Sequence, residues 1–186
     1  QNTKRFVRCF LALDKSLAYA RHYPAINWTM SYSEYYEDLD PYYTEHLGEK
    51  FCTMRGRILG LLSEENKLME IVKLIGADIL PEDQKLIIET AKLFRVGFLQ
   101  QNAYHAIDTY VPLDKQLRMM ELMLKLYSGA KDIVSRAIPL SQLKETGIFE
   151  SLAKMKYEVP NDGQEKFAEY DAAIEDALRQ VNEANR

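Results

Sequence analysis

The chain has 186 residues, of which 47% are apolar and 28% are charged. This is an ordinary globular composition, and the length allows one well-buried domain or one domain with part of a second. A net charge of −4 gives no basic surface for nucleic acid or anionic lipid, and no run of about 18 apolar residues predicts a membrane-spanning helix.

The residues that most often bind metals show no ligand-like spacing. Cys9 and Cys52 are far apart, and His22, His46 and His105 pair neither with each other nor with the cysteines. We therefore expect free thiols, a reducing cytosolic setting and no metal site. The sequence has no initiator methionine and no leader pattern, so we expect it to be part of a longer protein.

The first forty residues predict a small mixed α/β segment. Residues 4–13 combine aromatic and β-branched side chains with charges and predict a strand, which needs a partner to be stable. Residues 13–21 predict a short helix that Tyr23–Pro24 ends, because the residue before a proline is forced out of the helical region. The tyrosine-rich residues 31–43 indicate a core or subunit contact, with a carbohydrate or nucleobase site as the alternative.

The remainder of the chain is predicted to be helical. Apolar residues at helical spacing predict helices over 49–62 and 64–75, with Ser63 as the N-cap of the second and Gly76 at its end. Pro81 is expected to begin a third helix. The residues that we expect to face inward on this third helix are Leu86, Ile87, Thr90, Leu93 and Phe94.

Residues 113–134 predict a long helix, whose methionines we expect to fill the core. Ser141 is a candidate cap for a short helix, and Asn161 with Gln164 resembles a capping box for the last helix. The predicted fold is therefore mainly α: a helical bundle domain over 41–186, preceded by a mixed α/β remnant over 1–40, with the boundary near Asp40–Pro41.

The connection after Phe94 has an unusual composition. Residues 98–110 read FLQQNAYHAIDTY and place two glutamines, an asparagine and several aromatic residues between two helices. Loops between helices leave backbone groups and aromatic rings free to meet a ligand, although loops of this length are also common as plain connectors.

No motif in the chain supplies catalytic chemistry. The phosphate-binding pattern G-x-x-x-x-G-K-[ST] does not occur in the sequence, and neither does G-x-S-x-G. No cysteine has a histidine in a nucleophile context. We therefore expect no catalytic residues in this chain, and we expect the chain alone to be inactive.

Two segments resemble the catalytic A subunit of V/A-type rotary ATPases. The run FLQQNAY, followed by DTY, is similar to FLQQNAF…DTY of that family, and Arg21-His22-Tyr23-Pro24-Ala25-Ile26-Asn27-Trp28 is similar to RRHFPAINW. Smaller matches are Gln1-Asn2-Thr3, residues 13–18 and residues 31–33. The resemblance implies a nucleotide-binding domain that ends near Asp40, followed by the C-terminal helical domain. It also explains the missing phosphate loop, which lies earlier in these subunits.

The resemblance further implies an adenine pocket. Tyr23 matches an aromatic residue beside the adenine ring, and Tyr104 matches a second one where most relatives have phenylalanine. Tyr110 matches a further aromatic wall. Gln101, Asn102 and Ala103 would line the same pocket. ATP or ADP with Mg²⁺ is thus implied for the longer protein, and neither is expected to be bound to this chain alone.

The resemblance implies a mechanical role as well. The joint between the second and third helices is similar to the acidic lever that presses on the rotor shaft of these enzymes. The residues implied in this contact are Asp78, Ile79, Leu80, Pro81, Glu82 and Asp83.

The implied whole is a rotary ATPase or ATP synthase that couples ATP hydrolysis or synthesis to proton or sodium transport. Its implied partners are the B subunits of the hexameric head and the central-stalk rotor subunit, in a cytoplasmic head peripheral to the membrane. No nucleic acid and no direct membrane insertion are expected. The alternatives are a non-catalytic B-type paralogue and a stand-alone helical protein-interaction module.

Overall fold

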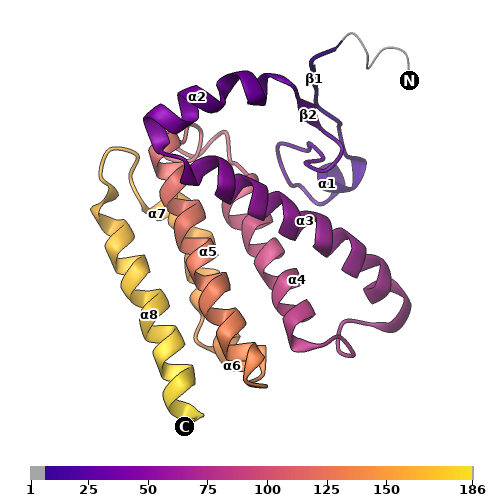
Figure 1. Cartoon of the computed structure of the whole chain (residues 1–186), viewed down its shortest axis with the longest axis vertical. Helices are drawn as coiled ribbons and strands as arrows, with labels where there is room; N and C mark the ends of the chain where they lie inside the picture. The colour runs from indigo at the N-terminus through magenta and orange to yellow at the C-terminus, as the bar shows by residue number, and fades with distance from the viewer. Residues whose placement is uncertain (1–6, 186) are drawn as a thin grey trace.

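A computed structural model describes residues 7–185 of the chain. The motif Gln1-Asn2-Thr3 and the start of the predicted strand lie outside the described residues. Figure 1 shows the described part as a small leading segment beside a set of long helices that pack side by side. The prediction of a mainly helical fold with a short mixed segment in front is confirmed.

The leading segment contains a two-stranded sheet and one short helix. Strand β1 (Cys9–Phe10) pairs antiparallel with β2 (Tyr32–Ser33), so the strand predicted over 4–13 is much shorter in the described residues and its partner lies in the same chain. Helix α1 (Lys15–Tyr19) lies within the predicted range but ends before Pro24 is reached. The chain leaves the helix at Arg21, whose φ of 56° is left-handed.

Helix α2 (Tyr35–Leu47) contains the tyrosine-rich stretch. It passes through Asp40 and Pro41 without a break, so the domain boundary that we placed there does not coincide with a helix end. The Tyr43 ring packs 5.0 Å from the ring of Phe51, which joins α2 to the next helix. The division into 1–40 and 41–186 stays a prediction.

Helix α3 (Lys50–Ile75) is one continuous helix, so the two helices predicted around Ser63 are wrong. The buried face of the helix continues through Leu62 and Glu65, on either side of Ser63. Ser63 itself faces solvent in the middle of the helix and does not act as a cap. Gly76 ends the helix with a φ of 85°, as predicted.

Helix α4 (Glu82–Phe94) begins directly after Pro81, which occupies the N-cap position. All five residues predicted to face inward on α4 are buried. The helix then continues as a π-helical turn, η2 (Arg95–Leu99), where a loop was predicted from residue 98. Helix α5 (Leu113–Ser135) matches its prediction, and its methionines Met119, Met120 and Met123 are buried.

Four further elements complete the chain: α6 (Leu140–Glu145), α7 (Ile148–Glu158), the 3₁₀ turn η3 (Gln164–Lys166) and α8 (Phe167–Ala184). Pro139, not Ser141, occupies the N-cap of α6. Asn161 does not cap the last helix either, because its side chain bonds to Lys115 and to two carbonyl groups of the α4–α5 connection. Helix α7 was not predicted.

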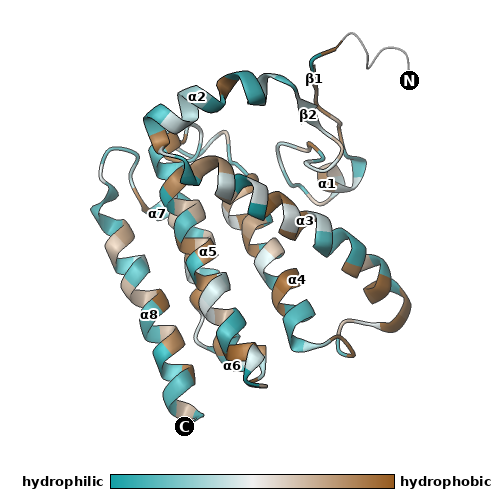
Figure 2. Cartoon of the chain, viewed as in Figure 1, coloured by the Kyte–Doolittle hydropathy of each residue, from teal (hydrophilic) through white to brown (hydrophobic). Residues whose placement is uncertain are grey.

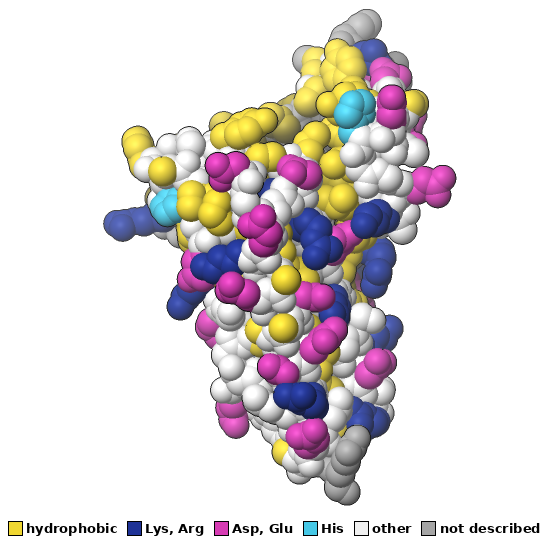
Figure 3. All heavy atoms as spheres, turned by 90° about the vertical axis from the view of Figure 1, so that its left-hand side faces the viewer, with side chains coloured by type: hydrophobic (Ala, Val, Ile, Leu, Met, Phe, Trp, Pro, Cys, Tyr) yellow, Lys and Arg dark blue, Asp and Glu magenta, His cyan; other side chains and the backbone are white. Residues whose placement is uncertain are grey.

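The core lies between α3, α4, α5, α7 and α8. Helix α5 packs against both α4 and α8, and α7 covers α4 and the π-helical turn. The side on which α8 lies carries Lys, Arg, Asp and Glu side chains interspersed over its lower part, with hydrophobic side chains gathered toward the end near α2 (Figure 3). This is the pattern of a solvated outer face over an apolar core.

Gly97 provides a test of how tightly η2 packs. A Cβ atom at this position would lie 2.9 Å from Met123 Cε and 3.0 Å from the Cα of Ala153 on α7. We expect Gly97→Ala to lower the free energy of unfolding by about 1–3 kcal/mol, because the α7 backbone must move. The matched control is Gly60→Ala on α3, where a Cβ meets nothing within 4 Å; it should raise stability by about 0.5–1 kcal/mol. Urea unfolding followed by circular dichroism measures both, and equal effects would contradict the packing argument.

Asp14 provides a test of the leading segment. Its carboxylate caps α1, accepting from Ser16 and Leu17, and also accepts from Asn27 Nδ2 at 2.9 Å. The hydroxyl of Ser16, the amide of Asn27 and the N–H of Leu17, in that order, lower the Asp14 pKa to about 2. Because the folded-state pKa is depressed, the stabilisation is present above the unfolded value of about 3.9 and is lost as the pH falls toward 2.

The matched variant is Asp14→Asn, which keeps a neutral cap of the same size. The melting temperature of the unmodified chain should exceed that of Asp14→Asn at pH 6, and the difference should shrink as the pH falls from 4 to 2. Thermal melting followed by circular dichroism measures it. A difference that is constant with pH would mean that the charge on Asp14 contributes nothing.

Candidate functional site

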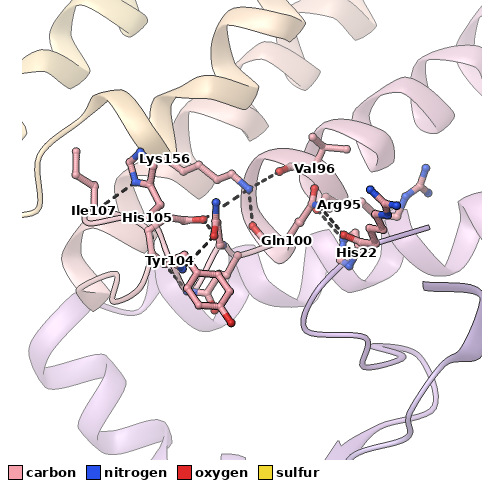
Figure 4. A network of polar contacts seen from close by, with 12 residues as sticks. His22, Arg95, Val96, Gln100, Tyr104, His105, Ile107 and Lys156 are labelled. Atoms are coloured by element: carbon pink, nitrogen blue, oxygen red, sulfur yellow. Dashed lines mark hydrogen bonds and ion pairs between the residues drawn. The ribbon is translucent and has the colours of Figure 1, made fainter. Parts of the chain in front are cut away.

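The leading segment lies against the start of the connection between α4 and α5. The backbone N–H of Gln101 donates to the carbonyl oxygen of Tyr23 at 2.8 Å. His22 is buried beside the end of α4, and its Nε2 lies 3.0 Å from the carbonyl oxygen of Arg95, as Figure 4 shows. These contacts place Tyr23 beside residues 100–104, although the two segments are far apart in the sequence.

A hollow of about 500 Å³ opens between these two segments. It is lined by five of the residues predicted for the adenine pocket, which are Tyr23, Gln101, Asn102, Ala103 and Tyr104. The structure adds three lining residues that were not predicted for the pocket, which are Arg21, Gln100 and Tyr157. Arg21 and Gln100 stand within the two motifs, and Tyr157 lies in neither. The structure therefore brings two distant motifs to one opening.

The aromatic rings of the hollow are available to a ligand. Tyr104 is fully exposed and Tyr23 is 55% exposed. Figure 4 shows the Tyr104 ring pointing away from the polar contacts beneath it, so its hydroxyl group meets water. No carboxylate is among the residues that line the hollow. The donor set thus suits a flat aromatic ring and does not fit Mg²⁺, which prefers carboxylate oxygens.

Asn102 shapes the loop from within. Its N–H donates to Asp108 Oδ2 at 2.6 Å, and its side-chain oxygen accepts the N–H of Tyr104 at 3.0 Å. The second contact is a local turn of the kind that asparagine forms readily. These two hydrogen bonds hold the loop backbone in place from Asn102 to Tyr104.

Lys156 of α7 lies beneath the loop and is only 2% exposed. Its ammonium donates to the carbonyl oxygens of Val96, at 2.7 Å, and of Gln100, and it lies 4.0 Å from Asp108 Oδ2. Burial lowers the pKa of Lys156, and the Asp108 carboxylate opposes that shift. A signal was present in the sequence, because Lys156 stands four residues after Leu152 at a core position of the helical pattern.

A second buried lysine holds the other end of the loop. Lys115 of α5 donates to the carbonyl oxygens of Lys156 and Val159 and to Asn161 Oδ1, at 2.7–3.0 Å. Asn161 Nδ2 in turn donates to the carbonyl oxygen of Tyr110 at 2.7 Å. Burial lowers the pKa of Lys115 as well, against the opposing charge of Asp108. The loop is thus attached to α5 and α7 through polar groups at both ends.

Tyr110 is the predicted pocket residue that the structure does not bring to the hollow. Its ring is 71% exposed and is not among the lining residues. Its contact with the rest of the site is through its backbone carbonyl group. The structure thus leaves the Tyr110 side chain outside the hollow, and its implied place in an adenine pocket stays a prediction.

The residues predicted to contact a rotor lie at the turn between α3 and α4, away from the hollow (Figure 1). Leu80 is buried, and Glu82 is occupied by Lys85 Nζ at 2.8 Å and by the N–H of Leu140 at 2.7 Å. These hydrogen bonds lower the Glu82 pKa, with that from Lys85 the larger cause. The members that remain exposed are Asp78, Ile79, Pro81 and Asp83.

This tip also carries apolar side chains in solvent. Ile79 in the turn is 70% exposed, and Leu74 at the end of α3 is 85% exposed. Ile71 and Ile75 of α3 are exposed as well. Figure 2 shows hydrophobic residues at the far end of α3 and in the turn that follows. These exposed apolar side chains at the tip, Ile71, Leu74, Ile75 and Ile79, are called the exposed apolar cluster below.

Two other kinds of site are absent from residues 7–185. No group of three or more His, Cys, Asp and Glu side chains in this range is placed to hold a metal ion. In the same range, no helix is both long and apolar enough to cross a lipid bilayer.

The matching domain model and the similar proteins all belong to V- or A-type ATP synthases. The model of the C-terminal domain of V and A type ATP synthase matches residues 40–144. The chain is 54% identical over 162 residues to V-type ATP synthase alpha chain 2 of Clostridium tetani, covering 87% of this chain and 27% of that protein. It is 47% identical over 176 residues to the V-type ATP synthase alpha chain of Halothermothrix orenii, covering 95% of this chain and 30% of that protein.

A solved structure supports the fold. The chain is similar to a structure described as a unique ATP synthase subunit NeqB from Nanoarcheaum equitans, with a TM-score of 0.56 and 18% identity, over 67% of this chain and 29% of that chain. At this identity the likeness shows the fold alone. The match to the domain model spans more than half of the chain, and the chain therefore belongs to the family of C-terminal domains of V- and A-type ATP synthases.

Proposed function

We propose that this chain is the C-terminal part of a catalytic A subunit of a V/A-type ATPase and that it supplies one side of an adenine pocket. The observation that carries the proposal is the hollow that Tyr23 and Tyr104 both line, although they come from two distant segments of the sequence. The names of the two relatives, both of them alpha chains, support the A type over the B type. The chain spans 27% to 30% of the length of these relatives.

The chemistry of the hollow suits one part of a nucleotide. Aromatic faces stack on a purine ring with about 1–3 kcal/mol per base, whatever the rest of the ligand carries. The lining residues contain no carboxylate for Mg²⁺. ATP or ADP would therefore place its base here, while its phosphates and Mg²⁺ are held by parts of the longer protein outside this chain.

The longer protein would couple ATP hydrolysis or synthesis to proton or sodium transport, with B subunits as neighbours in a hexameric head. A non-catalytic B-type paralogue would share the fold, and a stand-alone interaction module would bind a protein through α2 instead. A nucleoside titration distinguishes the interaction module from the adenine pocket, because under the module hypothesis residues 100–104 should not respond to a nucleoside.

Titration with adenosine tests the proposal. We expect the amide resonances of Gln101 to Tyr104 to shift with a dissociation constant on the order of millimolar, because stacking alone barely offsets the entropy of association. Tyr104→Ala should weaken binding by about tenfold or more. Tyr110→Ala is the matched control and should leave binding unchanged, since Tyr110 does not line the hollow. Shifts absent from the unmodified chain, or equal losses in both variants, would remove the proposed pocket.

We also propose that the tip between α3 and α4 contacts the central-stalk rotor subunit. Its exposed apolar cluster and the acidic side chains of Asp78 and Asp83 support this. Exposed charges contribute about 0–1 kcal/mol each, which suits a contact that forms and breaks repeatedly. Leu80 and Glu82 would act by holding the turn in shape, because they are engaged within the domain.

Site-directed cross-linking tests the tip. In the assembled ATPase, Ile79→Cys should react with a thiol–amine cross-linker to give a product that contains the central-stalk protein. The same reagent with Ser63→Cys, an exposed position halfway along α3, should give no such product above the background of Cys9 and Cys52. A product of equal yield at both positions, or none at position 79, would argue against the lever.

A further inference from the structure

The ammonium of Lys156 lies where the π-helical turn ends and the loop begins. It accepts no hydrogen bond and can donate up to three, and two of its acceptors are the carbonyl oxygens of Val96 and Gln100. These are carbonyl groups that the end of a helix leaves without an intrahelical partner. A buried cation at this point satisfies them and matches the negative end of the helix dipole.

Asp108 extends this contact to the middle of the loop. Its carboxylate is 1% exposed and lies 4.0 Å from Lys156 Nζ. The same oxygen, Oδ2, accepts the N–H of Asn102, and the Asn102 side chain holds the N–H of Tyr104. One chain of polar contacts thus runs from α7 to the backbone N–H of Tyr104, the residue whose side chain is fully exposed.

The neighbouring residue on α7 reaches the hollow directly. Tyr157 lines it, and the ring lies 4.7 Å from Lys156 Nζ and 4.8 Å from the ring of His105. The buried ammonium therefore lies against both Tyr157, which lines the hollow, and the backbone of the loop. Figure 4 shows Lys156 reaching from α7 toward Val96 and Gln100, with Tyr104 on the outer side.

We propose that Lys156 and Asp108 are positioning residues of the adenine pocket, which hold residues 100–104 in the conformation that presents Tyr104. This inference rests on the proposed function for its ligand, although its conformational part can be measured without one. A pair that served stability alone would be coupled to the whole bundle. A positioning pair is coupled first to the loop.

Removing the charge of Lys156 alone should loosen the loop locally, and removing the charges of both Lys156 and Asp108 should partly reverse that loosening. Lys156→Met removes the ammonium that lies 4.0 Å from the buried Asp108 carboxylate and leaves Lys115 as the remaining buried cation that its charge acts on, which costs more than the contact itself was worth. We expect amide hydrogen exchange over residues 100–110 to become about tenfold faster, with slow exchange in α5 unchanged. Adenosine should bind about tenfold more weakly. Adding Asp108→Asn to Lys156→Met should restore part of both losses.

The matched control is Lys154→Met, the same substitution two residues earlier on α7, where the side chain faces solvent. It should leave exchange and affinity unchanged within about twofold. Equal acceleration of exchange in α4, α5 and the loop of Lys156→Met, or a double variant worse than the sum of its parts, would reduce the pair to a structural role and overturn the inference.

The unmodified chain provides a test that does not depend on any variant folding. The Asn102 amide belongs to an exposed loop residue, and without Asp108 it would exchange freely. We expect it to be protected by at least about a hundredfold, because its partner is a buried carboxylate. Free exchange at Asn102 would overturn the positioning role even if adenosine binds. Protection at Asn102 with no response to adenosine would instead leave the loop positioned and remove the adenine pocket.

Discussion

A lysine ammonium inside a helical core must find acceptors there, because an unpaired buried charge is far too costly to keep. In this chain Lys156 finds them where a helix end leaves carbonyl groups free beside α7. The π-helical turn η2 and the loop after it are thereby fixed relative to α7. Asp108 lies 4.0 Å from the same ammonium and accepts the N–H of Asn102, which connects the turn at Asn102 to α7.

Apolar packing also brings η2 close to α7. Gly97 leaves room for Met123 and Ala153, and a larger residue would separate the two elements. That separation would pull the carbonyl groups of Val96 and Gln100 away from Lys156. Packing and hydrogen bonding therefore require the same backbone geometry, which is why an irregular helical turn can persist against α7.

Apolar periodicity was enough to predict most of the long helices. It predicted α5 and the inward-facing residues of α4, because apolar residues recur at helical spacing along both helices without a break. It failed at Ser63, where a good capping residue faces solvent in mid-helix. This error comes from a local preference that tertiary packing overrides. Asn161 was assigned to a cap for a similar reason, although its amide is used to join α5 to the loop.

Some residues of the hollow could be predicted from sequence motifs, whereas others are placed there only by packing. Tyr23, Gln101, Asn102, Ala103 and Tyr104 were available to sequence reasoning because each lies in a continuous motif. Tyr110 lies in a motif too, but the carbonyl contact to Asn161 directs its backbone and leaves its ring outside. Tyr157 and Lys156 carry no motif, since their role exists only once α7 has packed under the loop. A hollow of this kind is therefore a joint property of two sequence motifs and a third helix, and only the fold shows how the third helix contributes.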